Sequence, residues 1–174
     1  MFKSVVAAFD GSPHAGRALQ VGAELAAGDE ARLGIIYVVD KSQLQIPEEM
    51  RNLGVTEGVL EPMSSIQINF ANAPATMLDT MARLGADSLK TMVEYADFLL
   101  AEAEKHARQA GVTDVETAVE QGNPAEEIAA YAAAREADLI VCGSRGMGRW
   151  KSLLLGSTSS KLNQIAGCSC LIVR

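Results

Sequence analysis

Short runs of apolar residues alternate along the chain with segments in which apolar residues recur at helical spacing. A short, continuous apolar run is typical of a strand that is buried on both faces of a sheet. The predicted strands are 5–9, 33–39, 115–119, 139–142 and 168–173. Strands that alternate with helices in this way favour an α/β fold, in which helices cover both faces of one parallel sheet.

Capping residues mark the ends of the helices that this alternation requires. Ser12 can cap a helix whose first residue is Pro13, and residues 123–126 (Asn-Pro-Ala-Glu) have the form of a capping box with proline in the first turn. Glycines, which commonly end helices, follow the first two predicted helices. The predicted helices run from Pro13 to a stop at Gly28, from Leu89 to a stop at Gly111, from Pro124 to about Arg135, and from about Ser157 to Ile165.

Residues 41–88 do not fit the alternation, and a structureless loop of that length is unusual inside a compact domain. The segment holds three of the five prolines and four of the seven methionines. We therefore predict one domain over residues 1–174, with 41–88 as an insertion between the second strand and the second main helix. Short helices are expected at 47–53 and 75–84. The insertion can pack on the domain, close over a site as a lid, or form a further subunit interface.

The charge of the chain narrows the classes of partner. The chain has 174 residues, and its 15 basic and 22 acidic residues give a net charge of −7, which argues against a nucleic-acid binder. Residues 139–174 nevertheless contain five basic residues and no acidic residue. Such a segment is typical either of a site for a small anion or of a buried strand and loop flanked by unrelated basic residues.

Apolar length and cysteine usage indicate the compartment. No stretch of the sequence reaches the apolar length of a membrane span or of a signal-peptide core, so we expect a cytoplasmic protein. Cys142, Cys168 and Cys170 do not suggest a disulfide framework, and the C-x-C at 168–170 lacks the C-x-x-C spacing of redox and zinc motifs. We expect these cysteines to pack within strands, and the sequence identifies no metal ligands.

The residues that can carry chemistry follow the ends of predicted strands. Asp10, Val39 and Gly143 lie at carboxyl ends, where open parallel sheets bind their ligands. Asp10 can hydrogen-bond a ribose or an adenine, or it can simply end the first strand in a turn. The glycine-rich loop after the fourth strand favours binding.

That loop, residues 143–158, connects the fourth strand to the last helix. Glycines allow backbone N–H groups to approach a ligand closely, and a helix N-terminus favours phosphate. Its spacing differs from those of the Walker loop, the dinucleotide fingerprint and the nucleophile elbow. The loop therefore suits a polyphosphate, and its candidate ligands are Gly143, Arg145, Gly146, Gly156, Ser157 and Thr158.

The spacing Gly143-x2-Gly146-x9-Gly156-Ser157 resembles the G-2x-G-9x-G-[S/T] signature of ATP-binding universal stress proteins. Segments 6–13, 37–40 and 122–128 also resemble landmarks of that family, in the same order, so that the resemblance covers residues 1–40 and 89–174. It implies a five-stranded parallel sheet in the order 3-2-1-4-5 and a homodimer joined through the last strand.

The resemblance also implies a ligand and the residues that bind it. Asp10 and the backbone near Val39 would bind the adenosine. Gly143, Arg145, Gly146, Gly156, Ser157 and Thr158 would bind the phosphates of ATP, or of AMP or ADP, with Mg²⁺ bridging them.

Three functions remain open at this point. The first is an ATP-binding universal stress protein that acts as a nucleotide-dependent sensor or regulator in the stress response and signals to a regulatory protein. The second is a slow ATPase or phosphotransferase, although no Asp, Glu or His follows Asp138 to serve as a general base. The third is a nucleotide-independent interaction module that uses the methionine-rich insertion. Whether the chain is an enzyme therefore stays open.

Overall fold

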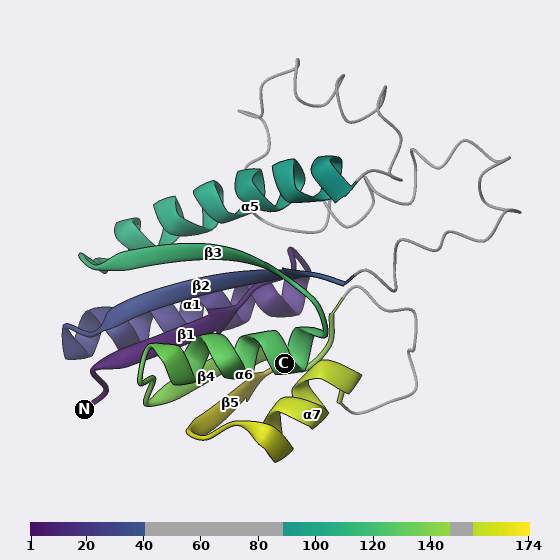
Figure 1. Cartoon of the computed structure of the whole chain (residues 1–174). Helices are drawn as coiled ribbons and strands as arrows, with labels where there is room; N and C mark the ends of the chain where they lie inside the picture. Colours follow the sequence, from purple (N-terminus) through teal and green to yellow (C-terminus); the bar gives the residue numbers. More distant parts are fainter. Residues whose placement is uncertain (41–88, 147–154) are drawn as a thin grey trace, which may run out of the picture.

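A computed structural model of the chain describes residues 1–40, 89–146 and 155–174 (Figure 1). The helices expected at 47–53 and 75–84, and with them the lid and interface hypotheses for the insertion, lie outside the described residues. The middle of the glycine-rich loop, residues 147–154, lies outside them as well.

The described strands form one parallel sheet in the order β3-β2-β1-β4-β5. They are β1 (Ser4–Ala8), β2 (Arg32–Val39), β3 (Val115–Gln121), β4 (Leu139–Gly143) and β5 (Ser169–Val173). The central strand β1 lies between β2 and β4, so that Ala7 pairs with Ile35 on one side and Val141 on the other. The predicted α/β fold and the strand order are therefore confirmed.

Helices cover both faces of this sheet (Figure 1). Helices α1 (Pro13–Asp29) and α5 (Leu89–Gln109) pack on one face, and α6 (Pro124–Ala134) and α7 (Ser157–Ile165) pack on the other. Successive residues of a strand point to opposite faces. In β1, Val5 and Ala7 accordingly contribute to the core under α1 and α5, whereas Val6 and Ala8 contribute to the core under α6.

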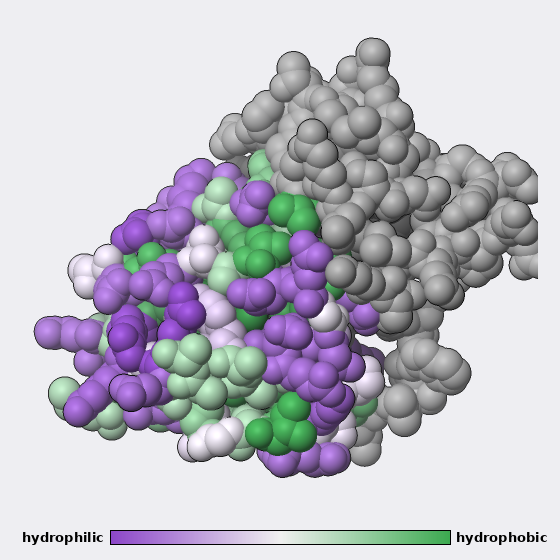
Figure 2. Space-filling view, viewed as in Figure 1, coloured by the Kyte–Doolittle hydropathy of each residue, from purple (hydrophilic) through white to green (hydrophobic). Residues whose placement is uncertain are grey.

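The surface over α6 and α7 mixes hydrophobic and hydrophilic residues (Figure 2). Ala130, Ala133 and Ala134 of α6 are exposed, as is Ile165 at the end of α7. Small side chains of this kind bury little apolar area, so this face does not by itself indicate a binding surface.

The helix caps follow the sequence with one correction. The Ser12 hydroxyl accepts a hydrogen bond from the Ala15 N–H at 3.2 Å, and Asn123 caps α6 by accepting from the Glu126 N–H. Helix α1 does not stop at Gly28 but continues to Asp29. It ends where Glu30 adopts a left-handed conformation (φ 53°), in which its N–H reaches the carbonyls of Ala26 and Ala27. The helix end is thus set by this backbone capping rather than by the glycine.

Gly143, the last residue of β4, allows the sheet to approach the first turn of α1 very closely. A Cβ atom at this position would lie 2.8 Å from the Ala15 backbone nitrogen and 2.8 Å from the His14 carbonyl carbon. Backbone atoms cannot move aside as a flexible side chain can, so glycine is required here for a steric reason.

We expect Gly143→Ala to lower the free energy of unfolding by about 1–3 kcal/mol, because α1 must move away from β4. Gly16→Ala is the matched control, since Gly16 lies in the same helix with open space around its Cβ position. This control should raise stability by about 0.5–1 kcal/mol through helix propensity. Urea denaturation of both variants is the measurement. A Gly143→Ala protein as stable as the wild type would contradict the close approach of β4 and α1.

Candidate functional site

A cavity of about 480 Å³ opens at the carboxyl ends of β1, β2 and β4. Residues from β2 and α6 line it on one side of β1, and residues from the β4–α7 connection line it on the other. The β2 side is mainly apolar and includes Ile36, Tyr37, Val38, Pro124 and Ile128. The cavity therefore joins an apolar surface to a polar one, as sites for small organic ligands commonly do.

Seven of the eight residues that the sequence singles out line this cavity. They are Asp10, Gly143, Arg145, Gly146, Gly156, Ser157 and Thr158. The structure thus brings the end of β1 beside the end of β4 and the start of α7, which lie more than a hundred positions further along the sequence.

Val39 is the predicted residue that the structure does not bring into the cavity lining. Its side chain is buried in the core under α1 and α5, and its carbonyl accepts a hydrogen bond from the Gly122 N–H at 3.2 Å. Val38 and Asp40, on either side of it, line the cavity. Because strand residues alternate between faces, Ile36 and Val38 share the α6 face with Ala8 and Cys142.

Asp10 is held at the end of β1 by a turn that it forms with its own chain. Its Oδ1 accepts a hydrogen bond from the Ser12 N–H at 2.9 Å. Its Oδ2 lies too close to the Cβ position of residue 146 for any side chain there, so a residue larger than Gly146 would force the carboxylate to move. One oxygen of Asp10 is therefore used to fix the turn, and the other faces the glycine-rich loop.

Ser144 holds this loop to three other elements. Its N–H donates to the Val173 carbonyl of β5 at 2.6 Å, and its own carbonyl accepts from the Gly156 N–H at 2.7 Å and from the Ser159 hydroxyl at 3.3 Å. The Ser144 hydroxyl lies 3.4 Å from Nδ1 of His14 in α1. Both serines are buried, and sequence reasoning missed them because neither belongs to the glycine spacing.

The first turn of α7 lies at the polar side of the cavity. The helix begins after Gly156, which has no side chain that can cap the first N–H groups. The positive end of the helix dipole, the hydroxyls of Ser157 and Thr158, and the exposed guanidinium of Arg145 therefore meet at one place. This combination is suited to an anion, above all a phosphate.

An ion pair joins the two helices that border the cavity on the α6 face. Nζ of Lys161 in α7 lies 2.6 Å from Oε1 of Glu126 in α6. The sequence pattern had suggested that Glu126 would close a capping box with Asn123, but its carboxylate pairs with Lys161 instead. An exposed pair of this kind adds little stability. Its effect is to favour one relative position of the two helices.

Cys142 lies in the wall of the cavity, yet it is not a reactive group. Burial raises the pKa of its thiol to about 12, so the thiol stays protonated at neutral pH. All three cysteines are free. Among the described residues, no group of three or more His, Cys, Asp or Glu side chains is arranged to hold a metal ion.

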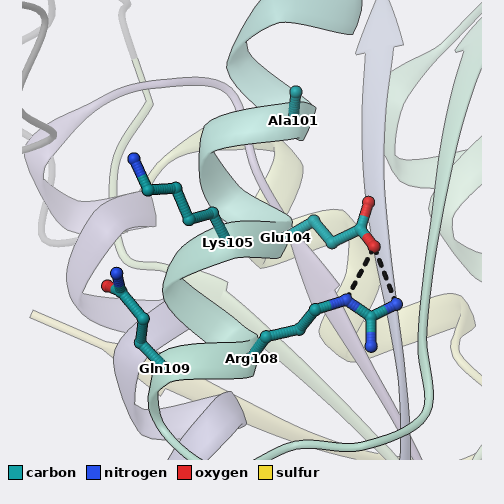
Figure 3. Close-up of a pocket in the computed structure, with 5 residues that line it drawn as sticks. All are labelled: Ala101, Glu104, Lys105, Arg108 and Gln109. Carbon is teal, nitrogen blue, oxygen red and sulfur yellow. Dashed lines mark hydrogen bonds and ion pairs between the residues drawn. The ribbon is translucent and has the colours of Figure 1, made fainter. Parts of the chain in front are cut away.

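A second hollow, of about 460 Å³, lies on the outer surface of α5 (Figure 3). Ala101, Glu104, Lys105, Arg108 and Gln109 line it, and all come from this one helix. Glu104 and Arg108 bind each other at 2.7 Å rather than facing a shared ligand position. The hollow is therefore a groove between exposed side chains, and the cavity at the strand ends is the candidate site.

Curated relatives match the chain over its full length. The universal stress protein in the QAH/OAS sulfhydrylase 3′ region of Thermus aquaticus is 32% identical over 174 residues, with 100% of each chain covered. The universal stress protein YxiE of Bacillus subtilis is 30% identical, again with 100% of each chain covered.

Among the described residues, no helix combines the length and the apolar character needed to cross a membrane.

Solved structures share the fold. The universal stress protein UspA from Lactobacillus plantarum superposes with a TM-score of 0.67 at 23% identity, covering 99% of this chain and 97% of its own. A universal stress protein in complex with cAMP gives 0.59 at 23% identity, with 99% and 97% covered. The universal stress protein from Archaeoglobus fulgidus in complex with dAMP gives 0.59 at 17% identity, with 100% and 98% covered.

The family model that describes the universal stress protein family matches residues 1–174. With this match, the two full-length relatives and the shared sheet topology, the chain belongs to the universal stress protein family.

Proposed function

We propose that this universal stress protein binds an adenine nucleotide, ATP in the first instance, and acts as a nucleotide-dependent sensor or regulator in the stress response. The observation that carries the proposal is the composition of the cavity. It combines an apolar side, a carboxylate in the middle, and the uncapped N-terminus of α7 with Arg145 on the far side of β1.

The three parts of the cavity match the three parts of a nucleotide. Ile36, Val38 and Ile128 offer an apolar surface to a planar base. Asp10 can accept hydrogen bonds from ribose hydroxyls, as acidic residues at strand ends do in other nucleotide-binding sheets. Arg145 and the start of α7 suit the phosphates. Two structural relatives in complex with cAMP and dAMP support an adenine nucleotide as the ligand class.

In this proposal, Mg²⁺ enters with the nucleotide. Mg²⁺ is commonly bound through phosphate oxygens, one or two protein oxygens and water. The described side chains include no cluster that would hold the ion without a nucleotide, so they fit an ion held by the phosphates better than a resident metal. We also propose that the protein acts in the cytoplasm. The proposed adenine-nucleotide ligand fits that compartment, and free cysteines such as those of this chain are typical of it.

We expect Arg145→Gln to weaken binding of ATP by about ten- to a hundredfold, because a charge-assisted hydrogen bond to phosphate is lost. Titration calorimetry with ATP, ADP and AMP is the measurement. The loss should grow with the number of phosphates, since Arg145 would bind phosphate and not adenosine. Thermal unfolding should not change, because the Arg145 side chain is exposed and the substitution keeps the backbone carbonyl that accepts a hydrogen bond from the Ser12 hydroxyl.

Lys105→Gln is the matched control for this experiment. It removes one positive charge from the exposed surface of α5 (Figure 3), and α5 packs on the opposite face of the sheet from α7. The control should bind all three nucleotides like the wild type. Equal binding by Arg145→Gln and the wild type would remove Arg145 from the site, and no binding by a folded wild-type protein would overturn the proposed ligand.

A homodimer joined through β5 is the second part of the proposal. Edge strands expose unpaired backbone groups, and proteins usually protect them with charged side chains. The edge strand β3 carries exposed Glu116 and Glu120, whereas β5 carries no charged residue and exposes 36% of Leu171. The unprotected edge β5 is therefore the better candidate for pairing with a second copy of this chain.

We expect Leu171→Lys to shift the protein from dimer to monomer, because a charge at the middle of β5 must be desolvated when two copies pair. Sedimentation velocity measures the change. Thr117→Lys is the control, since Thr117 occupies an exposed position on the other edge strand. A wild-type monomer, or a dimer that only the Thr117 variant disrupts, would contradict pairing through β5.

A further inference from the structure

His14 lies in the first turn of α1, next to Ser144 at the start of the β4–α7 connection. Its Nδ1 is 3.2 Å from Nη2 of Arg17 and 3.4 Å from the Ser144 hydroxyl. An arginine can only donate hydrogen bonds, so Nδ1 accepts from Arg17 and carries no proton. The neutral ring therefore holds its proton on Nε2.

Charged groups from three segments face this ring. Arg17 lies on α1 itself, Arg145 follows β4, and Asp10 follows β1. Burial, Arg17 and Arg145 together lower the pKa of His14 below its ordinary value of 6.5, and Asp10 opposes them. The positive end of α1 acts in the same direction as the two arginines. In the free protein, burial and an excess of positive charge thus both favour the neutral form of His14.

A bound phosphate would reverse this balance, because Arg145 and Asp10 both line the cavity. An anion beside Arg145 offsets the positive charge that His14 experiences and favours the charged ring. Nδ1 would then take a proton from solvent, and the exposed Arg17, which can no longer donate to it, would turn towards water. The Ser144 hydroxyl can accept from the new N–H.

We propose that His14 takes up a proton when a nucleotide phosphate occupies the cavity, so that mildly acidic pH tightens nucleotide binding. The inference rests on the adenine-nucleotide site proposed above and adds to it a residue that does not line the cavity. His14 acts here through charge and through Ser144 and Arg17, and it is a positioning residue.

The sign of the pH dependence follows from linkage. The free protein has a His14 pKa below 6.5, and the bound anion raises it. Above the bound-state pKa the ring is neutral in both states, and pH has no effect through it. Nucleotide affinity rises as the pH falls through the bound-state pKa, and it levels off below the free-state pKa. The total rise is about tenfold for each unit by which the two pKa values of His14 differ.

Titration calorimetry with cAMP tests this inference. The phosphodiester of cAMP keeps one charge through this range, so a change in affinity reports on the protein. Between about pH 7.5 and about pH 5.5, wild-type affinity should rise roughly three- to tenfold. His14→Gln should keep the weaker affinity at both pH values. His14→Lys should bind tightly at both, because its charge is permanent in this range.

His106→Gln is the matched control, because His14 and His106 are the two histidines of the chain. His106 is exposed in the last turn of α5, which leads into the start of β3, at the end of the sheet opposite to the cavity. This variant should keep the full pH dependence. A wild-type affinity that does not change with pH, or a pH dependence that survives in His14→Gln, would overturn the role of His14.

NMR titration of the two histidine rings, with and without saturating AMP, provides a second measurement that does not require a variant of His14 in the sample. The His106→Gln protein identifies the resonance of His14. A rise in the His14 pKa on addition of AMP supports the inference, and an unchanged value overturns it while leaving the nucleotide site intact. A folded protein that binds neither cAMP nor AMP would overturn the site and the inference together.

Discussion

The contact between the end of β4 and the first turn of α1 is the constraint on which the rest of the site depends. The absence of a side chain at Gly143 allows the two backbones to meet, and the hydroxyls of Ser12 and Ser144 then bridge the junction. Without this approach, the β4–α7 connection would not lie beside Asp10. The positions of the phosphate-binding candidates follow from a steric requirement before any ligand is considered.

The parallel sheet explains why the cavity lies at this end of the molecule. The connection from β1 leads towards β2, whereas β4 lies on the other side of β1, so the connections diverge at the carboxyl ends of the central strands. The β2 side receives apolar residues from α6, and the β4 side receives the start of α7. The divergence of the connections thus places the apolar β2 side of the cavity opposite the positive end of the α7 dipole.

Much of this arrangement could be predicted from the sequence. Helix α7 has the predicted bounds, and the caps at Ser12 and Asn123 are those that the sequence indicates. The alternation of elements predicts parallel strands, but the order of those strands came from the resemblance to a family, because periodicity carries no information about which strands are neighbours. Gly28 was misread as a helix end because the capping at Glu30 depends on backbone geometry.

The residues that sequence reasoning missed have a common physical cause. The partners of Ser144 lie in α1, β5 and α7, so its importance appears only when these elements come together. The resemblance pointed to the backbone near Val39, whereas the two-residue period of β2 places the side chains of Ile36 and Val38 on the face of Ala8 and Cys142. The alternation of side chains along β2 can be read from the sequence. Which of its two faces lines the cavity follows only from its neighbours Ala8 and Cys142.

Ser144 also connects the candidate site to the edge of the sheet. Its carbonyl binds the start of α7, where phosphates are proposed to bind, and its N–H binds the Val173 carbonyl at the end of β5. In the proposed function, a nucleotide that draws the loop towards its phosphates therefore acts on the last residue of the strand that is proposed to pair with a second copy. Two hydrogen bonds of one buried serine thus connect the turn that is proposed to bind phosphates to the strand that is proposed to pair, as the proposed regulatory function requires.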